Sequence, residues 1–296
     1  MLLPRLDRLA TLCVAAPLMK FLGPKAGTRV PILMYHSISE NLFGRSHPYY
    51  RINTAPEVFT EHMRLLHQAG YRTSGLCEMV DGLEAGKDLS KTVVLTFDDG
   101  YRDFLTDAMP VLKQCGFTAT IFLATDRIQN TAVCMEGVDY LTWKEVRELQ
   151  DEGISFGSHT VTHPDLRSLV PEQIEYELGR SKEIIEDKLG VPVHSFAYPF
   201  AFPEEDGDFM RFLSDELQNQ GFQNAVTTIL GRASRNHSCF FLPRLPVNSC
   251  DDRPFLRAKL NGGYDWLHWP QRLKKTILHN MTQMQRASWL ETPYSK

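Results

Sequence analysis

Two adjacent carboxylates close an otherwise apolar segment of the chain. The segment 92–97 reads TVVLTF and is followed by Asp98, Asp99 and Gly100. An apolar, β-branched run that ends in a glycine turn is typical of a buried strand, and α/β folds place ligands at the carboxyl ends of such strands. Neighbouring strand side chains point to opposite faces, so Asp98 and Asp99 can do different work, one holding a metal and one accepting a proton. The alternative is a solvated Asp-Asp-Gly turn.

Two histidines four residues apart form the second candidate site. His159 and His163 follow a short predicted strand in the segment SHTVTHP. Gly157 and Pro164 disfavour a helix, and a fully extended segment would separate the two rings by about 13 Å, too far for one metal. The segment must therefore curl if both histidines bind. With one carboxylate they would form a three-ligand set that leaves positions open for water and substrate, and zinc is the default metal for such a set.

The elements that must position these residues alternate along the chain from residue 30 onward. Strands are expected at 31–35, 93–97, 119–124, 154–156, 195–198, 225–228 and 240–245, and helices at 56–69, 103–114, 142–151, 171–189 and 208–219. Alternating strands and helices with short connections predict βα units and a parallel sheet. Thr142 and Glu145 predict a capping box at the start of the third helix. We expect one catalytic domain, residues 30–265.

The two ends of the chain combine apolar and basic side chains. Residues 9–22 are largely apolar and follow Arg5 and Arg8, but Pro17 and Lys20 interrupt the run and it is too short to span a bilayer. A frayed or docked helix in the segment 1–29 is therefore favoured over a signal peptide or a membrane-surface helix.

The C-terminal extension, residues 266–296, has the pattern of an amphipathic basic helix. Packing against the domain is favoured, and weak association with a membrane surface stays open. The sequence does not fix the compartment, although the two ends favour the cell envelope, the periplasm or the cytoplasmic membrane over the cytosol.

The composition of the chain narrows the class of protein. It has 296 residues, 43% of them hydrophobic, and a net charge of −4. No basic excess points to a nucleic-acid partner, so we exclude that class. The six cysteines are scattered without a CxxC pair, which is typical of buried thiols rather than of a disulfide framework or a zinc site.

The motifs TFDDGY at 96–101 and HTVTH at 159–163, in this order, resemble the polysaccharide deacetylases of carbohydrate esterase family 4. The similarity spans about residues 30–265. The opening segment PILMYHS at 31–37 is similar to the branch that acts on poly-N-acetylglucosamine and related exopolysaccharides. The resemblance implies a distorted (β/α) barrel and metal-dependent removal of N-acetyl groups from N-acetylglucosamine-type residues of a polysaccharide or oligosaccharide.

The resemblance also implies a role for each motif residue. The first aspartate, Asp98, would be the general base, and Asp99 would bind the metal beside His159 and His163. The backbone N–H of Phe200 would stabilise the oxyanion. This division agrees with the chemistry, because a carboxylate next to a metal can take the proton of the attacking water.

Three positions depart from the common family pattern. Ala197 stands where many members have arginine, Phe200 where tyrosine is usual, and a C-terminal Leu-x-Leu-His is absent. We expect Arg244, on a late strand, to replace the arginine that orients the base. We expect His36, at the end of the first strand, to replace the histidine that serves as the general acid.

Two other functions stay open at the level of sequence. The same scaffold could deacylate a small amide or an O-acetyl ester, or the chain could be a non-catalytic carbohydrate-binding relative. Four aromatic residues could line a sugar groove or fill the core: Tyr101, Trp143, Tyr198 and Phe202.

Overall fold

The strands of the protein close into a parallel barrel. The computed structural model describes residues 5–22, 28–40, 51–135 and 137–277. Within these residues, seven strands form a ring because β1 pairs with both β3 and β10. In the order around the ring they are β1 (Ile32–Tyr35), β3 (Thr92–Phe97), β4 (Thr120–Leu123), β7 (Ser155–Ser158), β8 (Ser195–Ala197), β9 (Asn224–Leu230) and β10 (Leu242–Pro246). This ring confirms the predicted (β/α) barrel.

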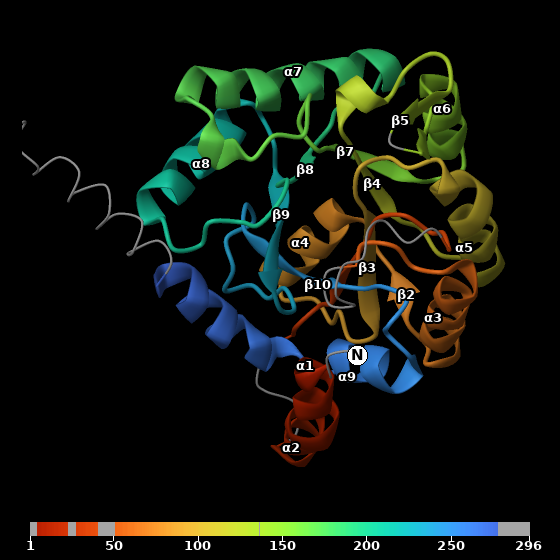
Figure 1. Cartoon of the computed structure of the whole chain (residues 1–296), viewed down its shortest axis with the longest axis vertical. Helices are drawn as coiled ribbons and strands as arrows, with labels where there is room; N and C mark the ends of the chain where they lie inside the picture. The colour runs from red at the N-terminus through yellow and green to blue at the C-terminus, as the bar shows by residue number, and fades with distance from the viewer. Residues whose placement is uncertain (1–4, 23–27, 41–50, 136, 278–296) are drawn as a thin grey trace, which may run out of the picture.

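Helices surround the barrel (Figure 1). They are α3 (Pro56–Gln68), α4 (Leu76–Glu84), α5 (Met109–Cys115), α6 (Trp143–Asp151), α7 (Pro171–Leu189), α8 (Gly207–Asn219) and α9 (Arg253–Leu260). A π-helical turn, Phe104–Ala108, leads into α5. The predicted capping box is present at α6, where the Thr142 hydroxyl accepts from the Glu145 N–H and the Glu145 carboxylate accepts from the Thr142 N–H.

Short elements complete the fold. Strand β2 (Arg72–Thr73) pairs with the beginning of β3, and an antiparallel hairpin joins β5 (Val133–Met135) to β6 (Val138–Tyr140). The six cysteines are free thiols, as expected, but the prediction that they are buried is wrong. Cys13 and Cys134 are exposed and the other four are half-buried.

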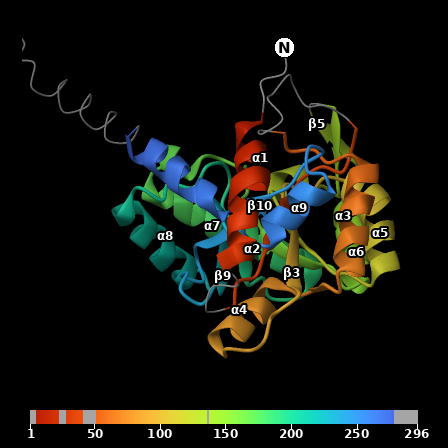
Figure 2. The same ribbon diagram turned by 90° about the horizontal axis from the view of Figure 1, so that it is seen from below.

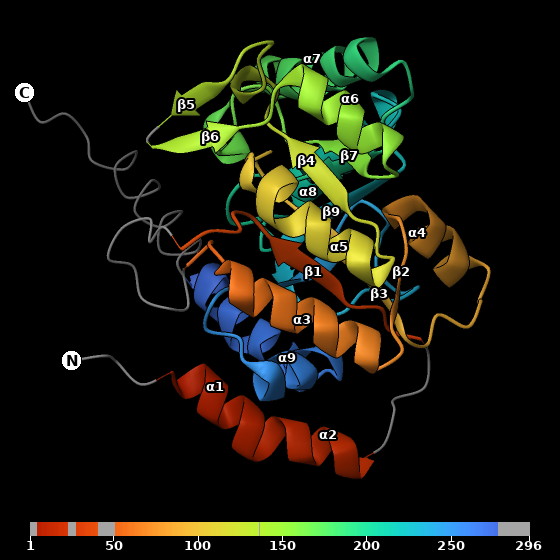
Figure 3. The same ribbon diagram turned by 90° about the vertical axis from the view of Figure 1, so that its right-hand side faces the viewer.

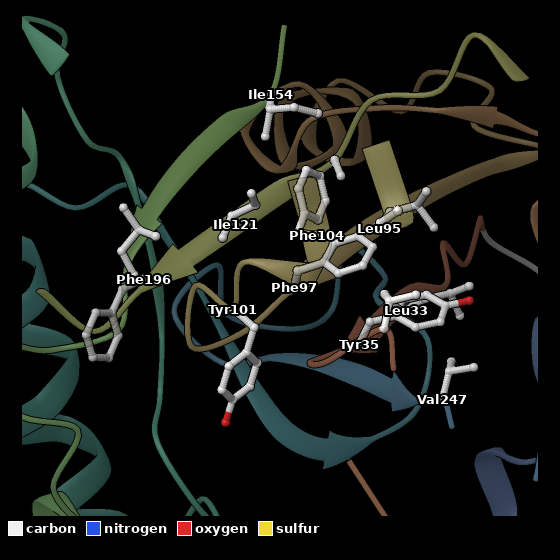
Figure 4. Packing of buried hydrophobic residues seen from close by; sticks show 14 of the residues in the cluster. Leu33, Tyr35, Leu95, Phe97, Tyr101, Phe104, Ile121, Ile154, Phe196 and Val247 are labelled. Carbon is white, nitrogen blue, oxygen red and sulfur yellow. The ribbon is translucent and has the colours of Figure 1, made fainter. Parts of the chain in front are cut away.

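Side-chain alternation along β3 separates an outer core from an inner core. Leu95 and Phe97 pack outward among residues of other strands and helices, including Phe104 and Ile121 (Figure 4). Val94 belongs to a second, smaller cluster that also contains residues from the beginnings of β1 and β10 and from α4. Because α4 packs against the beginnings of these strands, it covers the amino end of the barrel. Because every second residue shares a face, this inner row continues through Thr96 toward Asp98 at the carboxyl end.

The N-terminal segment forms a helix that packs against the barrel from outside. It consists of α1 (Leu6–Ala10), a π-helical turn (Thr11–Ala15) and α2 (Ala16–Leu22), and it runs alongside α9 (Figure 3). The Tyr264 hydroxyl donates to Asp7 at 3.0 Å, and the indole N–H of Trp266 donates to the Thr11 hydroxyl at 3.1 Å.

The predicted C-terminal helix is only partly within the described residues. Residues 268–277 are helical, and residues 278–296 lie outside the part of the chain that the structure describes. Among the described residues, no helix combines the length and the apolar character needed to cross a membrane.

Candidate active site

Asp99, His159 and His163 come together at the carboxyl ends of β3 and β7. Asp99 Oδ1 lies 3.8 Å from His159 Nε2 and 3.3 Å from His163 Nε2. One ligand atom from each of the three residues lies within 4.8 Å of the others. Asp99 and His159 are buried and His163 is half-buried, so the cluster opens to solvent on the His163 side.

The chain makes unusual turns to bring these side chains together. Among the described residues only five non-glycine residues have positive φ, and four of them surround this cluster: Asp99 (75°), Thr160 (70°), His163 (60°) and Phe200 (57°). Left-handed backbone is disfavoured for side chains with a Cβ, and such strain concentrates at functional sites. The curl that two histidines on one metal would require is therefore present, and the Thr160 hydroxyl supports it by accepting from the His163 N–H at 3.0 Å.

Glu177 holds the histidine segment from outside. This residue lies on α7 and is 7% exposed. Its carboxylate accepts from the backbone N–H groups of Val161 and Thr162 at 2.7 and 3.0 Å, and from the Thr162 hydroxyl at 2.8 Å. The sequence analysis did not identify Glu177. A signal was available, because Glu177 shares the buried face of its helix with Ile174 and Leu178.

The donor atoms of the cluster fit a divalent metal. The His159 Nδ1–H donates to the Ala197 carbonyl at 2.7 Å, which leaves Nε2 with a free lone pair directed at the cluster. Zinc bonds of about 2.0–2.2 Å in a tetrahedral arrangement place two ligand atoms about 3.4 Å apart, close to the separations seen here. Burial lowers the pKa of His159, and burial together with the neighbouring His159 lowers the pKa of His163 to about 4. Both rings are thus neutral near pH 7, the form that binds metals.

Asp98 is held in a different environment from its neighbour. Arg244 on β10 has no exposed surface and donates two parallel hydrogen bonds to Asp98, at 2.7 and 2.8 Å. The guanidinium is fixed in turn by the Thr227 carbonyl at 3.0 Å and the Thr96 hydroxyl at 3.2 Å. Burial alone would raise the pKa of Asp98, but the charge and hydrogen bonds of Arg244, together with the nearby His159 and His36, outweigh burial and hold the pKa of this carboxyl well below its usual range.

His36 lies beside this pair. It directly follows β1, and its Nε2 is 3.9 Å from Asp98 Oδ2. The Asp98 N–H donates to the Tyr35 carbonyl at 3.0 Å, so the backbone of the two strands fixes the separation. The His36 side chain is 18% exposed, which gives it access both to solvent and to the buried carboxylate.

Phe200 borders the cluster on the loop after β8. Its ring lies 4.9 Å from the His163 ring and its side chain is 53% exposed. The Thr228 hydroxyl donates to the Phe200 carbonyl at 3.1 Å and accepts from the Phe202 N–H at 2.9 Å, which fixes the loop to β9.

The four aromatic residues considered for a sugar groove are at most 8% exposed and fill the core instead: Tyr101, Trp143, Tyr198 and Phe202.

Arg127 is a further charged residue at this site. Its guanidinium lies 3.5 Å from Asp99 Oδ1 and 3.3 Å from the Tyr140 hydroxyl. No motif in the sequence marks Arg127, which lies in a three-residue 3₁₀ turn after β4, or Tyr140, the last residue of β6. All seven residues predicted from the sequence, His36, Asp98, Asp99, His159, His163, Phe200 and Arg244, lie around one end of the barrel.

The protein is a parallel β/α barrel in which a cluster of possible metal ligands lies beside a buried Asp–Arg pair. This combination is typical of metal-dependent hydrolases with a barrel fold. Comparison with known proteins narrows this class. Residues 85–209 match the family described as polysaccharide deacetylase. The chain is 34% identical over 221 residues to Bacillus subtilis YxkH, whose name places it among the polysaccharide deacetylases, and the match covers 74% of this chain and 72% of YxkH.

Two further relatives extend the comparison. The Escherichia coli poly-β-1,6-N-acetyl-D-glucosamine N-deacetylase is 25% identical over 59% of this chain, but the match spans only 30% of that protein. The solved structure of Streptococcus pyogenes deacetylase PplD in complex with acetate superposes with a TM-score of 0.67 at 26% identity, covering 79% of this chain and 99% of PplD. The chain belongs to the polysaccharide deacetylase family, and this membership indicates a hydrolase.

Proposed function

We propose that the protein is a metal-dependent deacetylase that removes N-acetyl groups from N-acetylglucosamine-type residues of an exopolysaccharide. The observation that carries the proposal is the pairing, at one barrel end, of the Asp99–His159–His163 cluster with an Asp98 carboxylate kept ionised by Arg244. The E. coli relative, which is named as a poly-β-1,6-N-acetyl-D-glucosamine N-deacetylase, supports an N-acetylglucosamine polymer as the substrate.

Asp99, His159 and His163 would hold the metal. When bound, a divalent cation at these residues would polarise the acetyl carbonyl and make a water molecule more acidic. The remaining chemistry belongs to groups of this chain.

Asp98 accepts the proton of the water as its oxygen adds to the carbonyl carbon, and Arg244 keeps this carboxylate ionised and oriented. The Phe200 N–H donates to the oxyanion that forms at that carbon. When the carbon–nitrogen bond breaks, His36 donates a proton to the departing amine, and acetate and a free amino sugar result. The 3.9 Å separation between His36 Nε2 and Asp98 Oδ2 supports this pairing of acid and base.

The test is acetate release from β-1,6-linked N-acetylglucosamine oligomers by protein loaded with zinc. The comparison substrates are chitin oligomers, acetylated xylan and a small N-acetyl amide. We expect the β-1,6 oligomers to give the highest kcat/KM, and we expect chelation to abolish release and added metal to restore it. Faster release from xylan or from the small amide would favour the alternative deacylase. Bound metal without release from any substrate would favour a carbohydrate-binding relative.

A further inference from the structure

Exposed apolar side chains gather on two helices outside the barrel. Fourteen large hydrophobic side chains are exposed among the described residues, and eight of them lie on the N-terminal helix and on the helix 268–277, so they form a patch rather than a scatter. On the N-terminal helix they are Leu6, Leu9, Val14, Leu18 and Phe21, and on the C-terminal one they are Trp269, Leu273 and Ile277.

The spacing of these residues gives one apolar stripe on the helix 268–277 and one on the last turns of the N-terminal helix. Trp269, Leu273 and Ile277 are four residues apart and therefore share a face. Leu18 and Phe21 share a face of α2 for the same reason, and Phe21 is 89% exposed. These side chains lack cover in the described chain, although burying apolar surface would stabilise the protein.

The two stripes belong to one surface. Leu18 and Met19 from α2 and Trp266, Trp269 and Arg272 from the C-terminal end line a common groove of about 660 Å³. Figure 2 shows the N-terminal helix in red and the C-terminal helix in blue on the same side of the molecule. We call this surface, formed by residues 5–22 and 268–277, the two-helix surface.

The charges of the two-helix surface are almost all positive. The segment 5–22 has Asp7 as its only acidic residue, and 268–277 has none. Asp7 is bonded to Arg5 at 2.6 Å, and its side chain is 11% exposed. Exposed cations flank the apolar stripes at Lys20, Arg272 and Lys274. The excess of exposed positive charge is local, because the whole chain carries a net charge of −4.

We propose that the two-helix surface docks on an anionic lipid bilayer, with the helices lying in the interface. Apolar stripes flanked by lysine and arginine are the pattern by which amphipathic helices bind anionic membranes without spanning them. Charge complementarity favours an anionic bilayer over a neutral apolar partner, since negative lipid headgroups would neutralise Lys20, Arg272 and Lys274. The proposal does not depend on the deacetylase activity.

The experiment is co-sedimentation of the full-length protein with lipid vesicles. One set contains phosphatidylcholine alone, and the other contains about one third phosphatidylglycerol. We expect binding to the anionic set to be at least about tenfold tighter and to weaken as salt is raised, because each surface cation contributes about fivefold. Absence of binding, or equal binding to the two sets, overturns the proposal.

Three double variants locate the contact. Leu18→Glu with Phe21→Glu should weaken binding to anionic vesicles by about tenfold or more, because it places charge in the apolar stripe. Arg272→Glu with Lys274→Glu should reduce anionic binding to the neutral level. The control matched to the first pair is Tyr176→Glu with Val191→Glu. It adds the same two negative charges at exposed apolar positions on and just after α7 and should bind like the parent.

Two outcomes would assign the surface differently. If the control weakens binding as much as the other pairs, the effect is one of net charge and the proposal fails. If light scattering shows a dimer that Leu18→Glu with Phe21→Glu dissociates, the surface pairs with a second copy of this chain instead. Circular dichroism and thermal unfolding of each variant verify the fold.

Discussion

Two neighbouring aspartates divide the proposed chemistry because their backbones differ. Asp98 continues the inner row of β3 and meets the buried Arg244, whereas Asp99 takes a φ of 75° and turns toward the two histidines. Each oxygen of the Asp98 carboxylate uses one lone pair to accept a hydrogen bond from Arg244. The other lone pair of each Asp98 oxygen stays available to accept a proton, whereas Asp99 Oδ1 faces both histidines and is suited to binding a cation.

The Asp98→Asn variant tests this division. We expect acetate release to fall by about 10²–10⁴-fold, because an amide cannot accept the proton of the water. Bound metal, measured by elemental analysis, should stay at the level of the parent. Asp99→Asn should lower metal content as well as activity, and Asp126→Asn on an exposed loop position should change neither. Loss of metal in the Asp98 variant with retention in the Asp99 variant would reverse the assignment.

His36 carries the second residue-scale prediction. In His36→Gln the side chain keeps its polarity but cannot protonate the departing amine, so we expect kcat to fall by about 10²–10⁴-fold while the metal stays bound. A substrate with a better leaving group, such as an aryl N-acetyl amide or aryl acetate, needs less protonation, and its hydrolysis should fall less. Equal losses on poor and good leaving groups would contradict the role of general acid.

At the scale of elements, the barrel strands fix Asp98, Arg244 and His36, while connections shape the rest of the site. The histidine segment depends on α7 through Glu177, which satisfies two backbone N–H groups of a strained turn. Outer groups that orient metal ligands typically contribute 10–100-fold to metal affinity. Glu177 is such a group although it contacts neither histidine side chain.

Glu177→Ala should therefore weaken metal binding by about 10–100-fold, measured by competition with a chelating dye. Glu177→Gln keeps one acceptor oxygen, and we expect it to restore part of the affinity. Glu175→Ala, at an exposed position of the same helix, is the control for helix propensity. A variant that loses thermal stability but binds metal with the parent's affinity would restrict Glu177 to a structural role.

The loop that carries Phe200 is tied to the C-terminal helix by Glu204. The Glu204 carboxylate accepts from the His268 ring at 2.6 Å and from Lys275 at 3.2 Å, and Lys275 also donates to the Phe202 carbonyl at 2.9 Å. Burial would raise the pKa of Glu204, but the bonds from His268 and Lys275 outweigh it and lower the pKa below its ordinary value of 4.5.

This anchor predicts a pH dependence of stability. A carboxyl group whose pKa is lowered by folding contributes its full stabilisation above its unfolded pKa and loses it as the pH falls through the folded value. The free energy of unfolding of the parent should exceed that of Glu204→Gln by about 1–2 kcal/mol at pH 7, and the difference should shrink below about pH 4.5. Urea titrations of both proteins between pH 7 and pH 3 measure this difference in the free energy of unfolding. A difference that is constant with pH would exclude ionisation of Glu204 as its cause.

The sequence predicts the barrel strands well because strands buried on both faces are continuous apolar runs, such as 93–97. It does not predict α4, which follows Gly75 without a capping side chain and contains Gly82. Nor does it predict the β5–β6 hairpin, in whose strands only Tyr140 is buried. The predicted site residues share one end because parallel strands all finish there. Arg127 could not be predicted, because its position depends on an irregular connection that only the tertiary structure defines.

At the scale of the whole molecule, both ends of the chain pack on the outside of the barrel. The N-terminal helix contacts α9 and the turn 264–266, and Arg5 lies 5.1 Å above the Phe255 ring. These contacts lie on a face formed by α9 and its following turn, and none of them includes one of the seven predicted site residues. The helix should therefore add stability without taking part in the chemistry.

Removal of residues 1–22 tests this separation. We expect the free energy of unfolding to fall by about 2–4 kcal/mol, because Tyr264 and Trp266 lose hydrogen-bond partners. Phe255 also loses its cation–π contacts with Arg5 and Arg8, and apolar surface near Leu12 becomes exposed. Metal content and kcat per folded molecule should stay within about twofold, since the barrel strands that hold Asp98 and Arg244 are unchanged. Tyr264→Phe, which removes one of these bonds, should cost about 1 kcal/mol and serves as the graded control. A truncated protein that keeps its stability but loses turnover would place the N-terminal helix in the catalytic machinery and contradict the separation argued from its contacts.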